Sequence, residues 1–353
     1  MMIRTTPALL VKSLLLTALA GSALPATAGD QYPNTSGIGQ DVNQDEAWYQ
    51  QCLRVEHVEP PAVAAGAQAT STKCDANGLY YDKRSQAVTG PAEWNKVRAC
   101  ALANSDDGVL MMLYANGYGV AKNPDLAIKY ACSLEHVAKA EMEARIAHLL
   151  RSANETSRKP FDFCDDITSG YSGAVCASIE ERQNAKVRQA RLSRFSKQLA
   201  PQVKAAFAAL QEASVLFAET RSDNESDMHG TGAAGFALQA KGKQSDLFVK
   251  DVLDAANGIR PHYTVEEYES LDAKLHAAYE SVLHTPSQQE GADERVGLST
   301  VIKAGVTQTE DVWLAYRDAW VTYVAAASIN WDPASVKALL TQRRIKQLLA
   351  IPY

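Results

Sequence analysis

Six cysteines constrain the fold of this chain more than any other feature, because all of them lie in its first half. They are Cys52, Cys74, Cys100, Cys132, Cys164 and Cys176. An even number of cysteines without a CxxC spacing favours three disulfides over a zinc or redox site. Six cysteines can pair in 15 ways. The sequence singles out only Cys164–Cys176, because Thr168-Ser169-Gly170 offers a turn between them, and leaves the other pairings open.

The N-terminus has the pattern of a secretory signal. Arg4 precedes an apolar stretch at residues 9–20, and Ala26-Thr27-Ala28 supplies the small residues that a signal peptidase needs. We therefore expect residues 1–28 to be cleaved and the mature protein to be periplasmic or secreted. No stretch is long enough to span a bilayer, so we expect no membrane insertion after cleavage.

Composition favours a helical protein of more than one domain. The chain has 353 residues, of which 46% are hydrophobic and only 7% are aromatic. Alanine is abundant and aromatics are sparse, which favours helices over a β-sandwich. The net charge is −6. We expect no basic stripe and therefore no nucleic-acid partner.

Residues 73–173 contain an internal repeat, after a flexible leader and loop at residues 29–72. The segments 79–102 and 113–134 have similar patterns, about 32–34 residues apart, which is the size of a helix–turn–helix repeat. Gly117 and Gly119 would let the backbone turn through positive φ. Residues 109–132 resemble a Sel-one-like repeat, a relative of the tetratricopeptide repeat. The resemblance implies a small module of stacked helices with a partner-binding surface.

The remaining residues, 174–353, have the periodicity of long amphipathic helices. The predicted helices are 174–200, 202–222, 233–256, 264–284, 293–328 (with a break considered near Gly305) and 333–349. Thr264 with Glu267 reads as a capping box, and Asp332-Pro333 as an N-cap and first helical residue. Short connections imply an antiparallel bundle. The predicted fold class is all-α: a disulfide-stapled helix–turn–helix repeat module followed by an antiparallel helical bundle.

Two of these helices carry a second resemblance. Residues 271–279 read LDAKLHAAY and residues 312–320 read VWLAYRDAW. They are similar to the paired "D-x-x-L-N-x-x-Y" and "W-L-x-Y-R-D" helices of the lysozyme inhibitor LprI-like family. The resemblance covers residues 262–349 and implies inhibition of a lysozyme-type muramidase. Phe217 and Arg221 repeat the spacing of Trp313 and Arg317, which predicts two diverged halves, 174–258 and 262–349.

One helix face in this region is the candidate partner-binding site. Trp313, Tyr316, Arg317 and Trp320 recur at the spacing of one helical face, and Asp318 adjoins them. An arginine can stack on a tryptophan and still pair with a carboxylate. The alternative is a core stripe in which the arginine only fixes helix register.

No catalytic residue, metal site or cofactor is expected. The GxGxxG match at residues 230–235 precedes a helix without a preceding strand, so it reads as a helix-start loop. His276 and His284 share a face but lie ~12 Å apart along a helix, too far to bind one ion. Asp165-Asp166 and Glu180-Glu181 are carboxylate pairs of the type that glycoside hydrolases use, by residue type alone.

The function predicted is an exported, non-enzymatic protein-binding module, by resemblance a lysozyme inhibitor. An acidic chain suits a basic lysozyme, because opposite charges speed encounter. The alternatives are a cell-envelope scaffold or assembly factor that uses the repeat to bind an envelope protein, and an enzyme acting on peptidoglycan.

Overall fold

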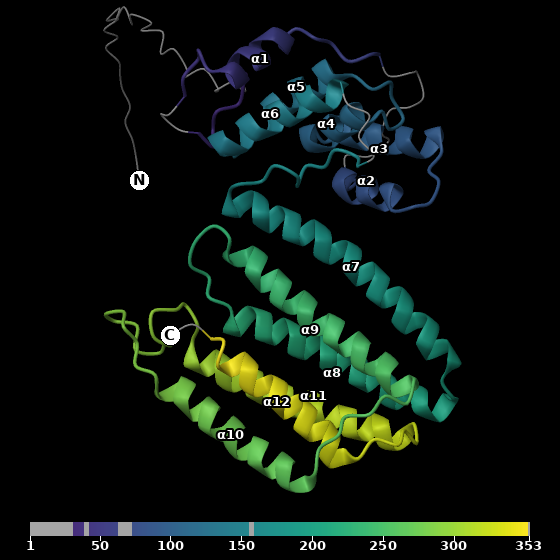
Figure 1. Ribbon diagram of the computed structural model, residues 1–353, viewed down its shortest axis with the longest axis vertical. Helices are drawn as coiled ribbons and strands as arrows, with labels where there is room; N and C mark the ends of the chain where they lie inside the picture. The colour runs from purple at the N-terminus through teal and green to yellow at the C-terminus, as the bar shows by residue number, and fades with distance from the viewer. Residues whose placement is uncertain (1–30, 39–41, 63–72, 155–158, 352–353) are drawn as a thin grey trace, which may run out of the picture. The chain divides into compact units, whose positions relative to one another are not determined.

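The computed structural model describes residues 31–38, 42–62, 73–154 and 159–351. Within these ranges the regular elements are helices and no strand forms, which confirms the all-α prediction (Figure 1). They are α1 (Ala47–Val55), α2 (Ala76–Arg84), α3 (Pro91–Ala103), α4 (Asp107–Asn116), α5 (Pro124–Ser133), α6 (Lys139–Asn154), α7 (Gly170–Gln198), α8 (Pro201–Glu225), α9 (Ala233–Ala256), α10 (Val265–His284), α11 (Lys303–Ala326) and α12 (Pro333–Leu348). The predicted signal peptide, residues 1–28, lies outside the described residues. The described residues from Tyr32 onward form one compact unit.

Helices α1 to α6 surround one hydrophobic core, which also includes Ile179 of α7. Three disulfides tie this region together: Cys52–Cys132, Cys74–Cys100 and Cys164–Cys176. The third joins the pair that the sequence singled out. Because Ile179 and Cys176 lie on α7, the first core extends beyond the domain boundary expected at residue 173.

The turn between α4 and α5 requires its two glycines. Gly117 and Gly119 have φ values of 71° and 67°, in the left-handed region. A Cβ on Gly119 would lie 2.3 Å from the Cβ of Trp94. The Trp94 ring stacks on Tyr118 with centroids 4.7 Å apart, and the Asn123 side chain caps α5. These contacts fix the turn that carries the Sel-one-like resemblance, and the resemblance itself stays a prediction.

Part of the segment expected to be a flexible leader is packed against the module. The backbone N–H of Asn34 donates to the carbonyl of Cys132 at 2.7 Å, and the Tyr32 hydroxyl donates to the carbonyl of Cys52 at 3.1 Å. Ile38 is buried in the first core. Both bonded carbonyls belong to disulfide-linked residues, so residues 32–38 are held by the most constrained part of the module.

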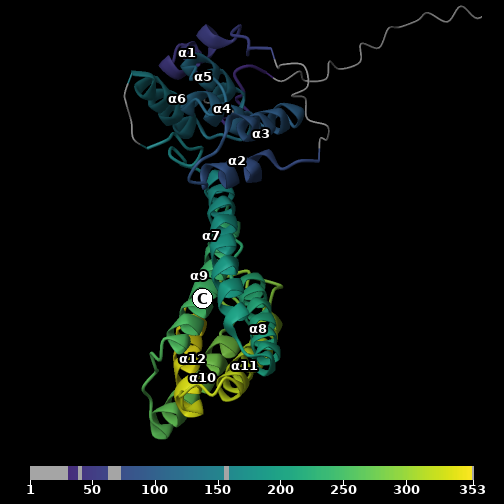
Figure 2. The same ribbon diagram turned by 90° about the vertical axis from the view of Figure 1, so that its right-hand side faces the viewer.

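Helices α7 to α12 enclose a second core. At its centre α8 and α11 run antiparallel: Phe207 lies near Tyr323, Phe217 stacks on Tyr316, and Asn224 bonds to Gly305. Helix α9 packs on α7 and α8, and α12 packs on α10 and α11 (Figure 2). Each predicted half therefore consists of three helices, α7 to α9 and α10 to α12, and in each half the first helix packs on the third. The middle helices of the two halves, α8 and α11, pack on each other. That these halves arose by duplication stays a prediction.

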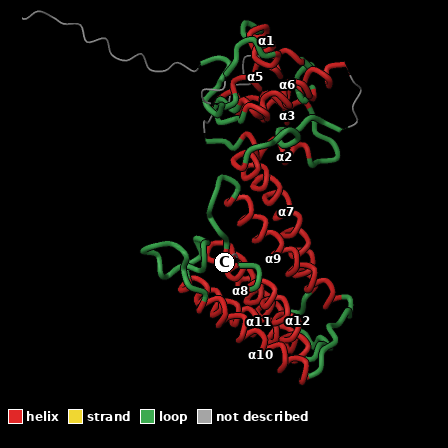
Figure 3. Tube along the Cα trace, turned by 60° about the vertical axis from the view of Figure 1, so that its left-hand side comes forward, coloured by secondary structure: helices red, strands yellow, loops and turns green. Residues whose placement is uncertain are grey.

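The predicted helix 293–328 is wrong over its first ten residues, because α11 begins at Lys303. Residues 285–302 form an ordered loop in which Arg295 and Ile302 make an isolated antiparallel bridge. Gly291 and Gly297 have φ values of 73° and 56°, which a right-handed helix does not allow. The loop joining α8 to α9 lies at the same end of the bundle (Figure 3).

Candidate functional site

The aromatic stripe of α11 is buried. Trp313, Tyr316 and Trp320 are each 1% exposed. Tyr316 stacks on Phe217 of α8 at 5.4 Å, and Trp320 stacks on Trp331 at 5.9 Å. Burial raises the pKa of the Tyr316 hydroxyl, which keeps it neutral. Of the five predicted partner-binding residues, these three join helices within the core and present no surface to a partner.

The other two predicted residues differ in exposure: the Asp318 side chain is 64% exposed, whereas that of Arg317 is only 14% exposed. The Arg317 guanidinium is 5.2 Å from the centre of the Trp313 ring and donates to Asp318 Oδ1 at 3.3 Å. Asp318 is an exposed neighbour in sequence, so this pair is a weak surface contact. On α10 the Tyr268 hydroxyl donates to Asp272 Oδ1 at 3.4 Å.

A buried charge network lies beneath this surface. Arg344 of α12 is fully buried and donates two bonds to the Glu225 carboxylate, at 2.8 Å and 2.6 Å. Its Nε donates to Glu310 at 2.8 Å, and Arg221 lies 3.6 Å from Glu225. Burial raises the pKa of Glu310 and lowers that of Arg221. For Arg344 burial alone lowers the pKa, but the Glu225 and Glu310 carboxylates outweigh it and the pKa is raised.

This network joins α8, α11 and α12, and its charges are paired with one another rather than with solvent. A second pair, Arg343 with Asp251, joins α12 to α9. These ion pairs fix how the helices pack together, and they offer no free group to a ligand.

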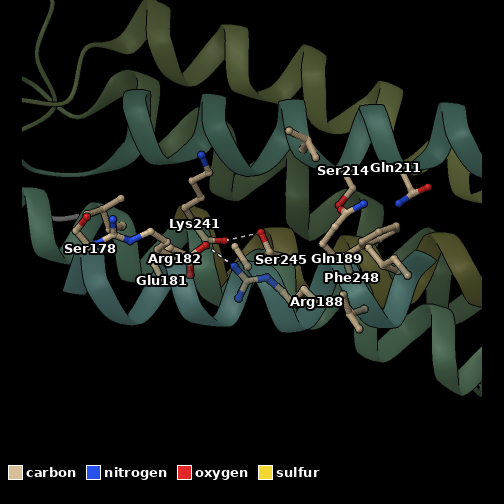
Figure 4. Close-up of a pocket in the computed structure, with 15 residues that line it drawn as sticks. Ser178, Glu181, Arg182, Arg188, Gln189, Gln211, Ser214, Lys241, Ser245 and Phe248 are labelled. Atoms are coloured by element: carbon tan, nitrogen blue, oxygen red, sulfur yellow. Dashed lines mark hydrogen bonds and ion pairs between the residues drawn. The ribbon is translucent and has the colours of Figure 1, made fainter. Parts of the chain in front are cut away.

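A groove of about 420 Å³ runs between α7 and α8 with α9 beneath it (Figure 4). Its walls are mixed, with Leu192, Val215 and Phe248 beside charged side chains. Figure 4 shows Arg188 joined to Glu181, and Arg188 also donates to Asp246 at 3.0 Å. The charges in the groove are therefore neutralised within the fold.

Three of the four carboxylates considered for glycoside hydrolysis are held in ion pairs, and the fourth, Glu180, is exposed. Asp165 pairs with Lys159, and Asp166 lies 2.9 Å from His148 Nδ1. Glu181 pairs with Arg188. Among the described residues, no group of three or more His, Cys, Asp or Glu side chains is placed to hold a metal ion. None of these positions offers two free carboxylates facing a common space.

The ordered loop 285–302 is the most distinctive exposed feature of the C-terminal half. Val296 and Val301 are buried and anchor it in the second core. The Val296 N–H donates to the Val301 carbonyl at 3.0 Å, and the Gln288 N–H donates to Gly297 at 2.9 Å. The two buried valines anchor both ends of the intervening turn, and Leu298 within that turn is exposed.

The neighbouring loop is fixed against this turn. Asp227 Oδ1 accepts bonds from the Thr300 N–H and hydroxyl, both at 3.0 Å, and the Thr300 hydroxyl accepts from the Met228 N–H at 2.6 Å. Burial alone would raise the pKa of Asp227, but bonds from Thr300 and His229 hold it below its usual value. The Asp227 carboxylate is thus the link between the two loops.

Three large aliphatic side chains are exposed on these two loops: Met228 (50%), Leu298 (58%) and Ile302 (46%). We call them the loop patch. Glu290, Asp293 and Glu294 on the loop 285–302, and Asp223 at the end of α8, are also exposed. An exposed apolar patch with a polar rim is typical of a protein–protein contact. Sequence periodicity does not reveal the loop patch, because it predicts a helix over residues 293–302. Met228 is also 70 or more residues away from Leu298 and Ile302 in sequence.

The fold and these surfaces define a disulfide-bonded, all-helical protein whose exposed features suit binding. Residues 262–348 match the family model described as "Lysozyme inhibitor LprI". The match spans α10, the ordered loop, α11 and α12, and it supports the resemblance seen in the C-terminal sequence. No curated protein and no solved structure matches the chain. Among the described residues, no helix is long and apolar enough to cross a membrane.

Proposed function

We propose that this protein inhibits a lysozyme-type enzyme by binding to it outside the cytoplasm. The observation that carries the proposal is the family match over residues 262–348, which coincides with three complete helices and the loop between them. Three disulfides and the predicted signal peptide support export, because disulfides persist in oxidising compartments.

The loop patch is the proposed contact. Two of its three side chains, Leu298 and Ile302, lie in the matched region, and both are about half exposed. Covering three half-exposed aliphatic side chains contributes about 3 kcal/mol to binding. The anchored turn adds to this, because a rigid loop loses little conformational entropy when it binds.

Charge supports the same partner. Residues 262–348 contain 12 acidic and 8 basic residues, a net charge of −4. Four exposed acidic residues lie on the loop 285–302 or at the end of α8: Asp223, Glu290, Asp293 and Glu294. A basic enzyme of the lysozyme type would therefore be attracted to this end of the bundle, and added salt should slow its association.

Inhibition assays test the function and the contact separately. The oxidised mature protein is titrated against lysozymes of several types. The variant Leu298→Asp with Ile302→Asp removes two of the three side chains and should weaken inhibition about 30-fold, the factor that corresponds to about 2 kcal/mol. The matched control is Val215→Asp with Leu216→Asp on α8, whose side chains are 56% and 53% exposed.

The outcomes are distinct. Failure of the wild-type protein to inhibit any lysozyme type contradicts the proposed function. Inhibition that the Leu298/Ile302 variant retains contradicts only the proposed contact. A third variant, Arg317→Glu with Asp318→Lys, tests the surface predicted from the sequence, and loss of inhibition there alone would move the contact to that surface.

The alternative function is a cell-envelope scaffold that uses residues 73–173 as a Sel-one-like module. The α4–α5 turn supports it, since Gly117 and Gly119 adopt the left-handed conformation which that resemblance requires. Recovery of one envelope protein by the wild-type chain, with no inhibition of lysozymes, would favour this alternative.

A further inference from the structure

The C-terminal half of α7 and the start of α8 form a strongly basic segment inside an acidic protein. Residues 182–211 contain seven basic residues and no acidic residue, whereas the whole chain has 41 acidic and 35 basic residues. The seven are Arg182, Lys186, Arg188, Arg191, Arg194, Lys197 and Lys204. The expectation of no basic stripe is therefore wrong. The net charge of the whole chain does not reveal this segment, because acidic residues elsewhere in the chain outweigh its seven positive charges.

Four of these residues share the solvent face of α7. At about 100° per residue, Lys186, Arg191, Arg194 and Lys197 fall within an arc of about 140°. All four are exposed, and the buried Leu192 lies on the opposite side. We call Lys186, Arg191, Arg194 and Lys197, with the exposed Lys204 at the start of α8, the basic face.

The fold neutralises only part of this charge. Arg182 pairs with Asp75, and Lys186 pairs with Asp82. The buried Arg188 pairs with Glu181 and Asp246. Within the described residues, Arg191, Arg194, Lys197 and Lys204 form no ion pair. Four positive charges on two adjoining helix ends repel one another, so an external anion would stabilise this arrangement.

We propose that the basic face binds the anionic phospholipid headgroups of a membrane surface. The face is the convex outer side of a helix, which suits a flat array of phosphates and needs no pocket. Each basic residue near such a surface strengthens binding about fivefold. The exposed Val187, at 51%, adds an apolar contact on the same side. The protein would bind at the membrane surface without inserting into it. This inference goes beyond the proposed inhibition of a lysozyme, because it concerns where the inhibitor is located.

A membrane fits this face better than a nucleic acid does. Single-stranded nucleic acid binding relies on exposed aromatic rings that stack on bases. The only aromatic residues in 182–211 are Phe195, which is half-buried, and Phe207, which is fully buried. The basic face thus offers charge without stacking.

Sedimentation with lipid vesicles tests this proposal on the full oxidised chain. Wild-type protein should bind vesicles of phosphatidylglycerol and phosphatidylcholine, should not bind phosphatidylcholine alone, and should be released by salt. The variant Arg191→Gln, Arg194→Gln and Lys197→Gln should bind about 100-fold more weakly. The control variant, Lys243→Gln, Lys274→Gln and Lys346→Gln, makes the same change in net charge on α9, α10 and α12 and should bind as the wild type does.

Equal binding by the triple α7 variant and the wild type would overturn the proposal, and so would failure to bind the anionic vesicles. Binding to a single-stranded oligonucleotide but not to the vesicles would also overturn it. Circular dichroism of both variants establishes that they fold, so loss of binding reports on the charges. Lysozyme inhibition, measured on the same α7 variant, should not change, because the basic face and the loop patch share no residue.

Discussion

Replacing Arg344 with methionine should strongly destabilise the helical bundle. The side chain is fully buried and makes three bonds of 2.6–2.8 Å, two to Glu225 and one to Glu310. Arg344→Met leaves the buried Glu225 with only Arg221 beside it and removes the ion-pair partner of the part-buried Glu310. Breaking a buried ion pair by removing one partner costs about 3–5 kcal/mol. The loss should be large because Glu225 is itself only 8% exposed and has little access to water.

Urea denaturation with the disulfides intact measures this loss. With a slope of about 2 kcal/mol per M, the midpoint should fall by about 2 M. The double variant Arg344→Met with Glu225→Met removes one charge of each sign and should recover part of the stability, because no Glu225 carboxylate is then buried without Arg344. A loss below about 1 kcal/mol for the single variant, or a double variant no more stable than the single one, would refute this reasoning.

Other perturbations should have smaller or more local effects. Removing the Cys52–Cys132 disulfide, whose residues are 80 apart in sequence, should cost about 4.5 kcal/mol of stability, against about 3 kcal/mol for Cys164–Cys176, whose residues are 12 apart. Thermal unfolding of the two variants, each with both cysteines of one disulfide replaced by serine, compares these losses. A larger loss for Cys164–Cys176 would contradict the prediction. Asp227→Asn should cost about 1 kcal/mol at neutral pH by weakening the bonds to Thr300. Because the pKa of Asp227 is lowered in the folded state, its contribution is complete above the ordinary carboxyl pKa of about 4 and is lost as the pH falls through the lowered value. Urea midpoints of the wild type and Asp227→Asn should therefore converge in acid, and a constant difference would count against the assignment.

Local sequence signals predicted several helix boundaries. The capping box of Thr264 and Glu267 starts α10, and Asp332 caps α12 with a proline following it. These signals succeed because they act over three or four residues and need no tertiary partner. The false helical assignment of 293–302 has the opposite cause: burial of Val296 and Val301 by the rest of the bundle selects a turn there.

The candidate site was less accessible to sequence reasoning. Helical periodicity correctly placed Trp313, Tyr316 and Trp320 on one face, but periodicity alone does not distinguish a core stripe from a binding surface. The decisive contacts are distant in sequence: Arg344 meets Glu225 across 119 residues, and Thr300 meets Asp227 across 73. The basic face is different, since counting acidic residues between 182 and 211 would have found it.

Hydrogen–deuterium exchange of the complex tests the central claim most directly. The amides of the oxidised protein are compared with and without a lysozyme that it inhibits. We predict slower exchange at residues 226–229 and 285–302, where the two bonded loops present Met228, Leu298 and Ile302. Unchanged exchange in both loops, with slowing confined to the exposed surface of α10 and α11 around Asp318, would contradict the claim.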